Sequence, residues 1–263
     1  MTGIVIFSPN RFSLYTCTVS ELLIQRGQKV SAIFVRRLFN PSRLGSEYQR
    51  DGKRLLTKIW KKLFLRQAAY TGRAENIVSF REKIGISASN VQQLNKVYSI
   101  PVFSCSDLND DLVLNGLEKF SPDLVVFTGG GLIRQPVLDL AGQGVINCHM
   151  GVLPEFRGMD VVEWPLLLDR PDQVGISVHF MDKGLDTGDI LAVQRIIPKP
   201  GESVTNLRER MEPIMCQFLV DTCCDFLDGK VARKPQLLKE GRQYFKMHPL
   251  LNEFTQAKLG QTG

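Results

Sequence analysis

Residues 3–8 of the chain are Gly-Ile-Val-Ile-Phe-Ser, a short apolar run rich in β-branched side chains. Such a run predicts a buried strand. Residues 13–26 follow with a helical pattern, and residues 29–35 (Lys-Val-Ser-Ala-Ile-Phe-Val) predict a second strand. A strand–helix–strand order predicts parallel pairing through a right-handed crossover. The first 35 residues therefore indicate an α/β fold.

The alternation of strands and helices resumes near residue 100. Further strands are expected at 100–103, 123–128, 144–148, 175–181 and 190–197, with one more short strand within 241–249. Helices are expected at 107–120, 135–140 and 202–228, and Ser203 or Thr205 is expected to cap the last one. We therefore predict a Rossmann-like, open, mostly parallel sheet with a small C-terminal α/β extension.

The composition is that of an ordinary globular protein. The chain has 263 residues, of which 43% are hydrophobic and 23% are charged, and this excludes a fully disordered chain. No stretch approaches the roughly 18 consecutive apolar residues that a membrane span requires. The first residues open directly with a strand-like run and lack the pattern of a signal peptide. We therefore expect a cytoplasmic protein without a membrane partner.

The cysteines do not indicate a metal site. Six are present, and none has the spacing of a zinc site. Without an export signal, reduced thiols are the default expectation. We expect no metal cofactor. The cysteines are Cys17, Cys105, Cys148, Cys216, Cys223 and Cys224.

The positive charge of the chain is concentrated in one segment. The net charge is +6, and residues 36–73 carry eleven Lys or Arg against two acids, which leaves about −3 for the rest. Within this segment, residues 53–66 predict an amphipathic helix with one basic face. That face could be solvated, could contact a phosphate-bearing acceptor, or could meet a partner or membrane surface. The charge therefore characterises one segment and not the whole fold.

Two segments carry the residue types that chemistry requires. Asn147 and His149 are two residues apart, so both point to the same side of an extended strand. An amide and an imidazole placed in this way can hold a carbonyl oxygen that becomes negatively charged. Asp186 lies in a loop with glycines on either side, and its carboxylate could orient or charge an imidazole. Each of these two segments alone is weak evidence for a functional site, because Asn-x-His sequences and Gly-rich turns are common.

The order and flanks of these two segments resemble a known family. The stretch Ile-Asn-Cys-His-Met-Gly-Val-Leu-Pro-Glu-Phe-Arg-Gly at 146–158, followed by Gly-Ile-Ser-Val-His-Phe-Met-Asp-Lys-Gly-Leu-Asp-Thr-Gly-Asp-Ile at 175–190, is similar to the folate-dependent formyltransferases. That family includes methionyl-tRNA formyltransferase, glycinamide ribonucleotide transformylase and sugar-nucleotide N-formyltransferases. The resemblance covers roughly residues 1–37 and 96–210. It implies the formyltransferase fold.

The resemblance also implies a domain division. Residues 1–210 would form the catalytic domain, with a basic helical insertion at 38–95, and residues 211–263 would form a short C-terminal extension.

The chemistry that the resemblance implies is formyl transfer from N10-formyltetrahydrofolate to an amine. Asn147 and a protonated His149 would donate hydrogen bonds to the oxyanion of the tetrahedral intermediate. Asp186 would keep His149 charged and help to move protons. No metal is required.

The resemblance implies a folate site next to these residues. Gly131, Leu132 and Ile133 match the family's pterin loop, in which glycine lets the backbone approach a flat ring. The opposite wall would consist of Met181, Asp182, Gly184 and Leu185.

The family's members use different acceptor amines, and two departures narrow the choice. Residues 7–12 lack the Gly-rich pattern that glycinamide ribonucleotide transformylase carries after its first strand. The segment after Met211 looks mostly helical, whereas methionyl-tRNA formyltransferase carries a β-barrel domain there. We therefore expect a small-molecule amine acceptor, such as an amino sugar on a nucleotide carrier.

Three alternatives remain open. These are a tRNA acceptor, which the basic insertion could serve, a formyltetrahydrofolate hydrolase, and a non-catalytic folate- or RNA-binding module. The sequence leaves the oligomeric state open, and an oligomer is compatible with it.

Overall fold

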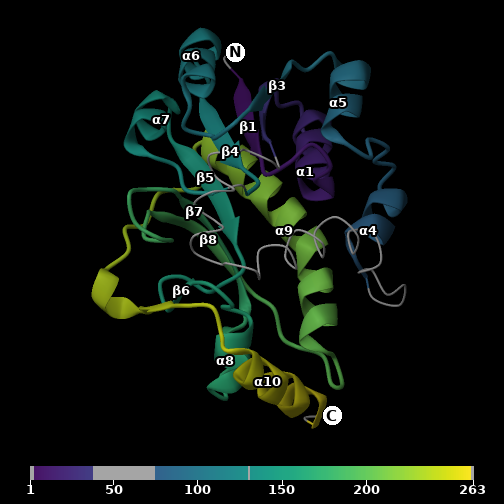
Figure 1. Cartoon of the computed structure of the whole chain (residues 1–263), viewed down its shortest axis with the longest axis vertical. Helices are drawn as coiled ribbons and strands as arrows, with labels where there is room; N and C mark the ends of the chain where they lie inside the picture. Colours follow the sequence, from purple (N-terminus) through teal and green to yellow (C-terminus); the bar gives the residue numbers. More distant parts are fainter. Residues whose placement is uncertain (1–2, 38–74, 130, 262–263) are drawn as a thin grey trace, which may run out of the picture.

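The computed structural model describes residues 3–37, 75–129 and 131–261 (Figure 1). Its main feature is a seven-stranded sheet with the strand order β3-β2-β1-β4-β5-β7-β8. Five strands are parallel, whereas β7 runs antiparallel to β5 and β8 antiparallel to β7. The strands are β1 (Ile4–Ser8), β2 (Val30–Arg36), β3 (Val102–Cys105), β4 (Leu124–Phe127), β5 (Val145–His149), β7 (Gly175–Phe180) and β8 (Ile190–Arg195).

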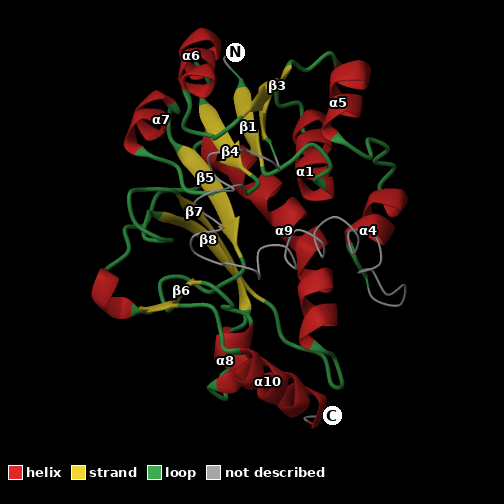
Figure 2. Ribbon diagram, in the orientation of Figure 1, coloured by secondary structure: helices red, strands yellow, loops and turns green. Residues whose placement is uncertain are grey.

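Helices cover both faces of the sheet (Figure 2). Helices α1, α4, α5 and α9 share a core with one face, and α6 and α7 share a core with the other. Their bounds are α1 (Leu14–Gln25), α4 (Ile77–Lys83), α5 (Val91–Tyr98), α6 (Asp111–Phe120), α7 (Gln135–Leu140) and α9 (Val204–Leu227).

Strand β1 shows how the sequence produces these two cores. Ile4 and Ile6 point into the core beneath α1 and α9, and Val5 and Phe7 point into the core beneath α6 and α7. All four side chains are buried, and each such burial contributes roughly 1.5–3 kcal/mol. A strand that is apolar on both faces must therefore lie in the middle of the sheet, as β1 does between β2 and β4.

The predicted fold class is confirmed. Each expected strand and helix that falls on described residues is present, with ends that differ by a few residues. Ser203, not Thr205, caps α9, because its side chain accepts a hydrogen bond from the backbone N–H of Asn206 at 3.1 Å. The domain boundary expected at residue 210 falls within α9, which is continuous. The basic helix expected at 53–66 lies outside the described residues.

The C-terminal part of the chain contributes a strand and a helix that pack against earlier elements. Strand β9 (Arg242–Tyr244) pairs in parallel with β6 (Phe156–Gly158), and these two form a second small sheet. Helix α10 (Pro249–Gln261) packs against α8 (Glu163–Leu167), and both lie at the lower end of the molecule in Figure 1. Two single-turn 3₁₀ helices, η1 (Pro171–Gln173) and η2 (Leu238–Glu240), complete the described elements. Elements β6, α8 and α10 were not predicted from the sequence.

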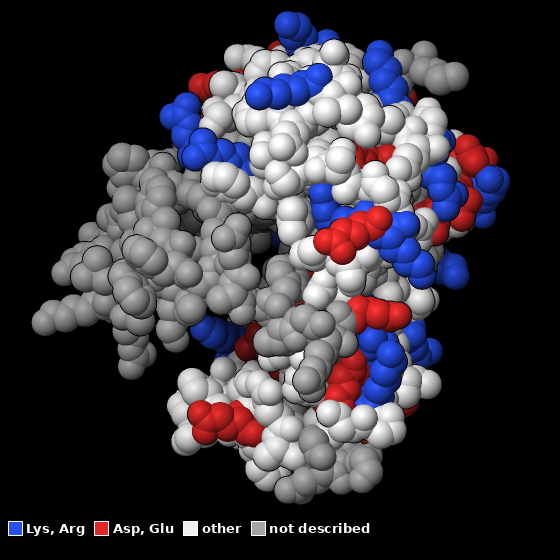
Figure 3. Space-filling view, turned by 90° about the vertical axis from the view of Figure 1, so that its right-hand side faces the viewer, with Lys and Arg blue, Asp and Glu red and all other residues white. Residues whose placement is uncertain are grey.

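Charged side chains are interspersed on the described surface. On the face shown in Figure 3, Lys and Arg alternate with Asp and Glu, with the largest mixed group along its right-hand part. This mixture fits the near balance of charge that the sequence gives outside residues 36–73. None of the helices that the structure describes combines the length and the apolar composition needed to cross a membrane.

Candidate active site

The candidate site lies where β5 meets β7. Asn147 and His149 both belong to β5, two residues apart. The antiparallel register places Asn147 opposite His179 of β7. The amide Nδ2 of Asn147 lies 3.3 Å from Nε2 of His179, and His179 is buried whereas Asn147 is partly buried. The site is therefore built from a parallel strand and its antiparallel neighbour.

Asp186 joins these residues from the loop between β7 and β8. Its Oδ2 lies 3.7 Å from Nδ1 of His149, and its Oδ1 lies 3.7 Å from Nε2 of His179. The backbone N–H of Gly158 also donates to Oδ2 at 2.9 Å. The structure thus brings together Asn147, His149 and Asp186, the three residues that the sequence singled out.

The loop that carries Asp186, residues 181–189, has a tightly determined shape. Asp186 adopts a left-handed backbone conformation with φ 55°, which L-residues rarely occupy. A side chain at Gly188 would lie 2.0 Å from the carbonyl oxygen of Phe180. Oδ1 of Asp182 accepts from the backbone of Gly184 at 3.0 Å and from the Thr187 hydroxyl at 2.7 Å. The loop is therefore held close to the sheet, and its shape fixes where the Asp186 carboxylate lies.

His179 is a site residue that the sequence reasoning missed. Its Nδ1 lies 2.8 Å from the carbonyl oxygen of Phe180. A carbonyl can only accept, so we assign the ring proton to Nδ1, which leaves Nε2 to accept from the Asn147 amide. This contact orients the amide. One feature of the sequence could have pointed to His179: it lies in the second segment that resembles the family, two residues before Met181.

Burial lowers the pKa of both imidazoles. Burial lowers the pKa of His149, and Arg208 lowers it further, against the opposing effect of Asp186 and the Phe156 carbonyl. Burial also lowers the pKa of His179 to about 4. For the site as it stands here, the balance of these effects lowers the pKa of His149, whereas the resemblance implied that Asp186 keeps this ring charged. The loss of hydration outweighs the attraction of one carboxylate.

Arg208 is a second residue that the sequence reasoning missed. It lies on α9, where its guanidinium pairs with the buried carboxylate of Glu163 at 2.9 Å and 2.5 Å. Its Nη1 also lies 3.6 Å from Sδ of Met150, the residue that follows His149. A long helix far along the chain thus adds a positive charge near the candidate site.

A cavity of about 380 Å³ opens beside these residues. It contains all seven residues that the resemblance implied for the folate. Leu132 is 71% exposed and Leu185 37% exposed, so two apolar side chains face outward there. His149 is not among the lining residues, and its Nε2 lies 3.3 Å from the Phe156 carbonyl. The lining residues are Phe127, Gly131, Leu132, Ile133, Arg134, Gln135, Asn147, His179, Met181, Asp182, Lys183, Gly184, Leu185 and Asp186.

Gly131 fits the requirement for a close backbone approach in this cavity. Its φ of 127° lies in the region that favours glycine, and a Cβ there would lie 3.0 Å from the Arg36 guanidinium. The loop can therefore present backbone groups to a flat ring on one side, opposite Met181 to Leu185 on the other.

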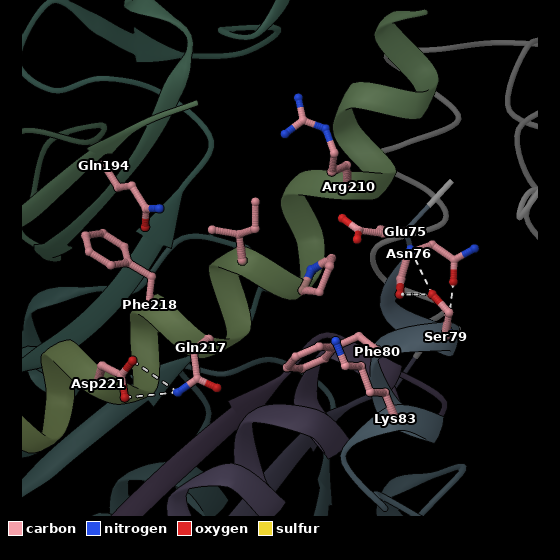
Figure 4. Close-up of a pocket in the computed structure, with 12 residues that line it drawn as sticks. Glu75, Asn76, Ser79, Phe80, Lys83, Gln194, Arg210, Gln217, Phe218 and Asp221 are labelled. Atoms are coloured by element: carbon pink, nitrogen blue, oxygen red, sulfur yellow. Dashed lines mark hydrogen bonds between the residues drawn. The ribbon is translucent and has the colours of Figure 1, made fainter. Parts of the chain in front are cut away.

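A second cavity of about 500 Å³ lies elsewhere, between α4 and α9 (Figure 4). Its labelled side chains include Phe80 and Phe218, with Gln194 of β8 at one side. It is the larger of the two but contains none of the residues that the sequence predicted for the site. We therefore place the candidate active site in the cavity beside Asn147 and Asp186.

The fold and site define a class of protein. An open α/β sheet binds ligands beyond the carboxyl ends of its strands, and here a polar cluster and a cavity lie at the ends of β4 and β5. The chain belongs to the formyl transferase family, whose family model matches residues 72–223, more than half of the chain. The match begins within the range expected to be an insertion and ends beyond residue 210.

Curated relatives match a similar length of the chain. The chain is 32% identical over 152 residues to the methionyl-tRNA formyltransferase of Desulfotalea psychrophila, which covers 57% of this chain and 47% of that protein. It is 34% identical over 140 residues to the methionyl-tRNA formyltransferase of Syntrophus aciditrophicus, and this match covers 53% of this chain and 45% of that protein. The chain thus spans about half the length of these curated relatives.

Solved structures share the fold. The glycinamide ribonucleotide transformylase 1 of Symbiobacterium toebii superposes with a TM-score of 0.60 at 14% identity, over 90% of this chain and 94% of that one. This likeness concerns the fold and not the acceptor.

Proposed function

We propose that this chain is an N-formyltransferase that moves a formyl group from N10-formyltetrahydrofolate to an amine. The observation that carries the proposal is a single juxtaposition. The carboxylate of Asp186 and the amide of Asn147 lie in the wall of the cavity formed by the seven residues expected to hold the folate. His149 lies next to Asp186, with its Nδ1 3.7 Å from the Asp186 carboxylate.

The residues present fit a folate. A pterin ring is flat and has polar edges, and the cavity offers backbone groups at Gly131 to Ile133 on one side and Met181 to Leu185 on the other. Leu132 provides an exposed apolar surface for the ring. Burying apolar area of this kind favours binding by about 25 cal/mol per Å². Arg134 and Lys183 line the same cavity and carry positive charge.

Asn147 would stabilise the oxyanion. When the neutral amine attacks, its nitrogen bonds to the formyl carbon and the carbonyl electrons move to oxygen. One N–H of the Asn147 amide points to Nε2 of His179. We assign the second N–H to the developing oxyanion. Because His179 already fixes the amide, the donor is oriented before the reaction begins.

His149 and Asp186 would move the proton. With Nε2 donating to the Phe156 carbonyl, Nδ1 of neutral His149 carries a lone pair and faces Asp186. The Asp186 carboxylate, which lines the cavity, would relay the proton that the attacking amine loses to Nδ1 of His149, and it would then stabilise the imidazolium. The proton is delivered to N10 as the bond from the formyl carbon to N10 breaks, which releases tetrahydrofolate. A neutral imidazole at rest is the form that this role requires.

For the acceptor, we propose a small-molecule amine such as an amino sugar carried on a nucleotide. An aminoacyl-tRNA is the second candidate, and the similarity to methionyl-tRNA formyltransferases supports it. Both share the chemistry described above, because each presents a primary amine.

The test is a screen of amines with N10-formyltetrahydrofolate. Amino-sugar nucleotides and methionyl-tRNA are incubated with the protein, and formylated products are detected by mass spectrometry alongside absorbance of the folate product. Formyl transfer to one of these amines, lost in Asn147→Ala, supports the proposal. Formate release that does not depend on any amine would instead identify a hydrolase. Absence of both reactions, with no folate binding, would contradict the proposal.

A further inference from the structure

Gln236 contacts the Asp186 loop from a distant part of the chain. Its Nε2 donates to the carbonyl oxygen of Asp186 at 3.1 Å and to that of Gly188 at 2.5 Å. Both acceptors are carbonyls, so the NH₂ end of the amide must face the loop. Oε1 of Gln236 is buried and has no hydrogen-bond partner among the described residues. The hydrogen bonds that this side chain makes within the described structure are thus directed at the loop.

The loop needs such a restraint. Asp186 has φ 55°, and holding an L-residue in the left-handed region costs roughly 1–2 kcal/mol. Hydrogen bonds to Asp182 fix the beginning of the loop, through Gly184 and Thr187. The two bonds from Gln236 fix the peptide groups on the other side, at Asp186 itself and at Gly188. Without them, the carbonyl of Asp186 would be free to rotate and relieve the strain.

The segment that carries Gln236 is itself anchored. Lys234 and Ile190 exchange two backbone hydrogen bonds of 2.9 Å each, which form an antiparallel bridge to the start of β8. Arg233 lies over the ring of Phe180 at 3.7 Å and donates to the carbonyl of Gln143. Gln236 therefore projects from a segment that is held on β8 through Ile190, on β7 through Phe180 and on the turn before β5 through Gln143, within the sheet that carries Asn147.

We propose that Gln236 is a positioning residue for the reaction: it fixes the backbone of Asp186 so that the carboxylate stays against His149 and beside the cavity. This inference rests on the proposed function. Gln236 does not line the cavity, and its hydrogen bonds within the described structure go to backbone carbonyls of the loop. It acts through the loop, so it affects the rate of the chemical step more than folate binding.

The test compares two substitutions of Gln236 that separate size from hydrogen bonding. Gln236→Met keeps length but removes the N–H donors, whereas Gln236→Lys keeps donors at a similar length. Gln243→Met is the matched control, because Gln243 lies in the same C-terminal segment with an exposed side chain. Hydrogen–deuterium exchange of a peptide covering 182–189 reports the loop directly. Kinetics with the acceptor found in the screen report kcat and the KM for N10-formyltetrahydrofolate.

We expect Gln236→Met to accelerate exchange in 182–189 and to lower kcat by about 10²-fold, the usual effect of a misplacement near 1 Å. Its KM should change less than threefold, Gln236→Lys should retain more activity, and Gln243→Met should match the wild type. Equal losses in Gln236→Met and Gln236→Lys would overturn the proposal, because the donors would then not matter. Unchanged exchange and kcat in Gln236→Met would overturn it as well.

Exchange also separates this inference from the function on which it rests. If the wild type neither binds folinic acid, used as a stable folate probe, nor transfers formyl groups, the proposed function fails. Faster exchange of 182–189 in Gln236→Met would still show that Gln236 holds the loop.

Discussion

Nδ1 of His149 faces Oδ2 of Asp186 across 3.7 Å in a setting where burial lowers the pKa of the imidazole. The carboxylate is too far away for a strong hydrogen bond, yet it raises the pKa of His149 against the effect of burial. The His149 imidazole is therefore expected to take up a proton during the reaction and not in the resting enzyme. This relationship determines the pH behaviour expected of the site.

Asp186→Asn removes the charge but keeps an oxygen that can accept from the Gly158 N–H. Because Asp186 raises the pKa of His149, this pKa should fall in the variant. Formyl transfer should fall by about 10²-fold or more, since losing one electrostatic stabiliser usually costs 10²–10³ in rate. NMR titration of the His149 imidazole and kcat measurements check both effects. A variant with wild-type kcat would remove Asp186 from the mechanism.

Arg208→Gln removes a positive charge that lowers the pKa of His149. The pKa of His149 should therefore rise, and the acid limb of the pH–rate profile should move to higher pH. Arg210→Gln is the matched control, because Arg210 lies on the same helix and pairs with Glu202 at 2.7 Å. Identical pH profiles for wild type and Arg208→Gln would contradict the assignment of the acid limb to His149.

Stability should fall as the solution is acidified. His179 has its pKa lowered from 6.5 to about 4, so below pH 6.5 the unfolded chain binds a proton that the folded chain excludes. The free energy of unfolding is therefore fully present above pH 6.5 and declines until about pH 4, by about 3 kcal/mol for this group. Urea unfolding at several pH values measures the slope. His179→Gln should reduce it, and an unchanged slope would mean that His179 is not buried neutral.

Leu132 offers a test of the folate wall. It is 71% exposed, so Leu132→Ala should change the unfolding midpoint little. If the pterin covers this side chain, the Kd for folinic acid should rise by about tenfold, equivalent to about 1.4 kcal/mol of lost contact. Isothermal titration calorimetry measures the affinity. Leu168→Ala, at a leucine 46% exposed outside the cavity, is the control. Equal Kd values for both variants would place the folate elsewhere.

The strands of the main sheet and four of the eight described α-helices (α1, α6, α7 and α9) could be predicted individually because their signals are local. The run from Ile4 to Phe7 is apolar at every position, and such a run finds a stable place only within a sheet covered on both faces. The capping role of Ser203 is local in the same way. Elements β6, α8 and α10 escaped prediction because the three-residue β6 exists only through pairing with β9, and α8 and α10 pack on each other.

Sequence alone indicated the order of the buried strands along the chain and the motif residues Asn147, His149 and Asp186, and its family resemblance pointed to seven of the residues that line the cavity. Tertiary structure alone decided that β7 turns antiparallel beside β5, which brings His179 to Asn147. It also decided that Gln236 reaches Asp186 across fifty residues of chain and that burial lowers the pKa of both imidazoles. The physical reason is that periodicity is a property of neighbouring residues, whereas strand register and the loss of hydration depend on segments far apart in the chain.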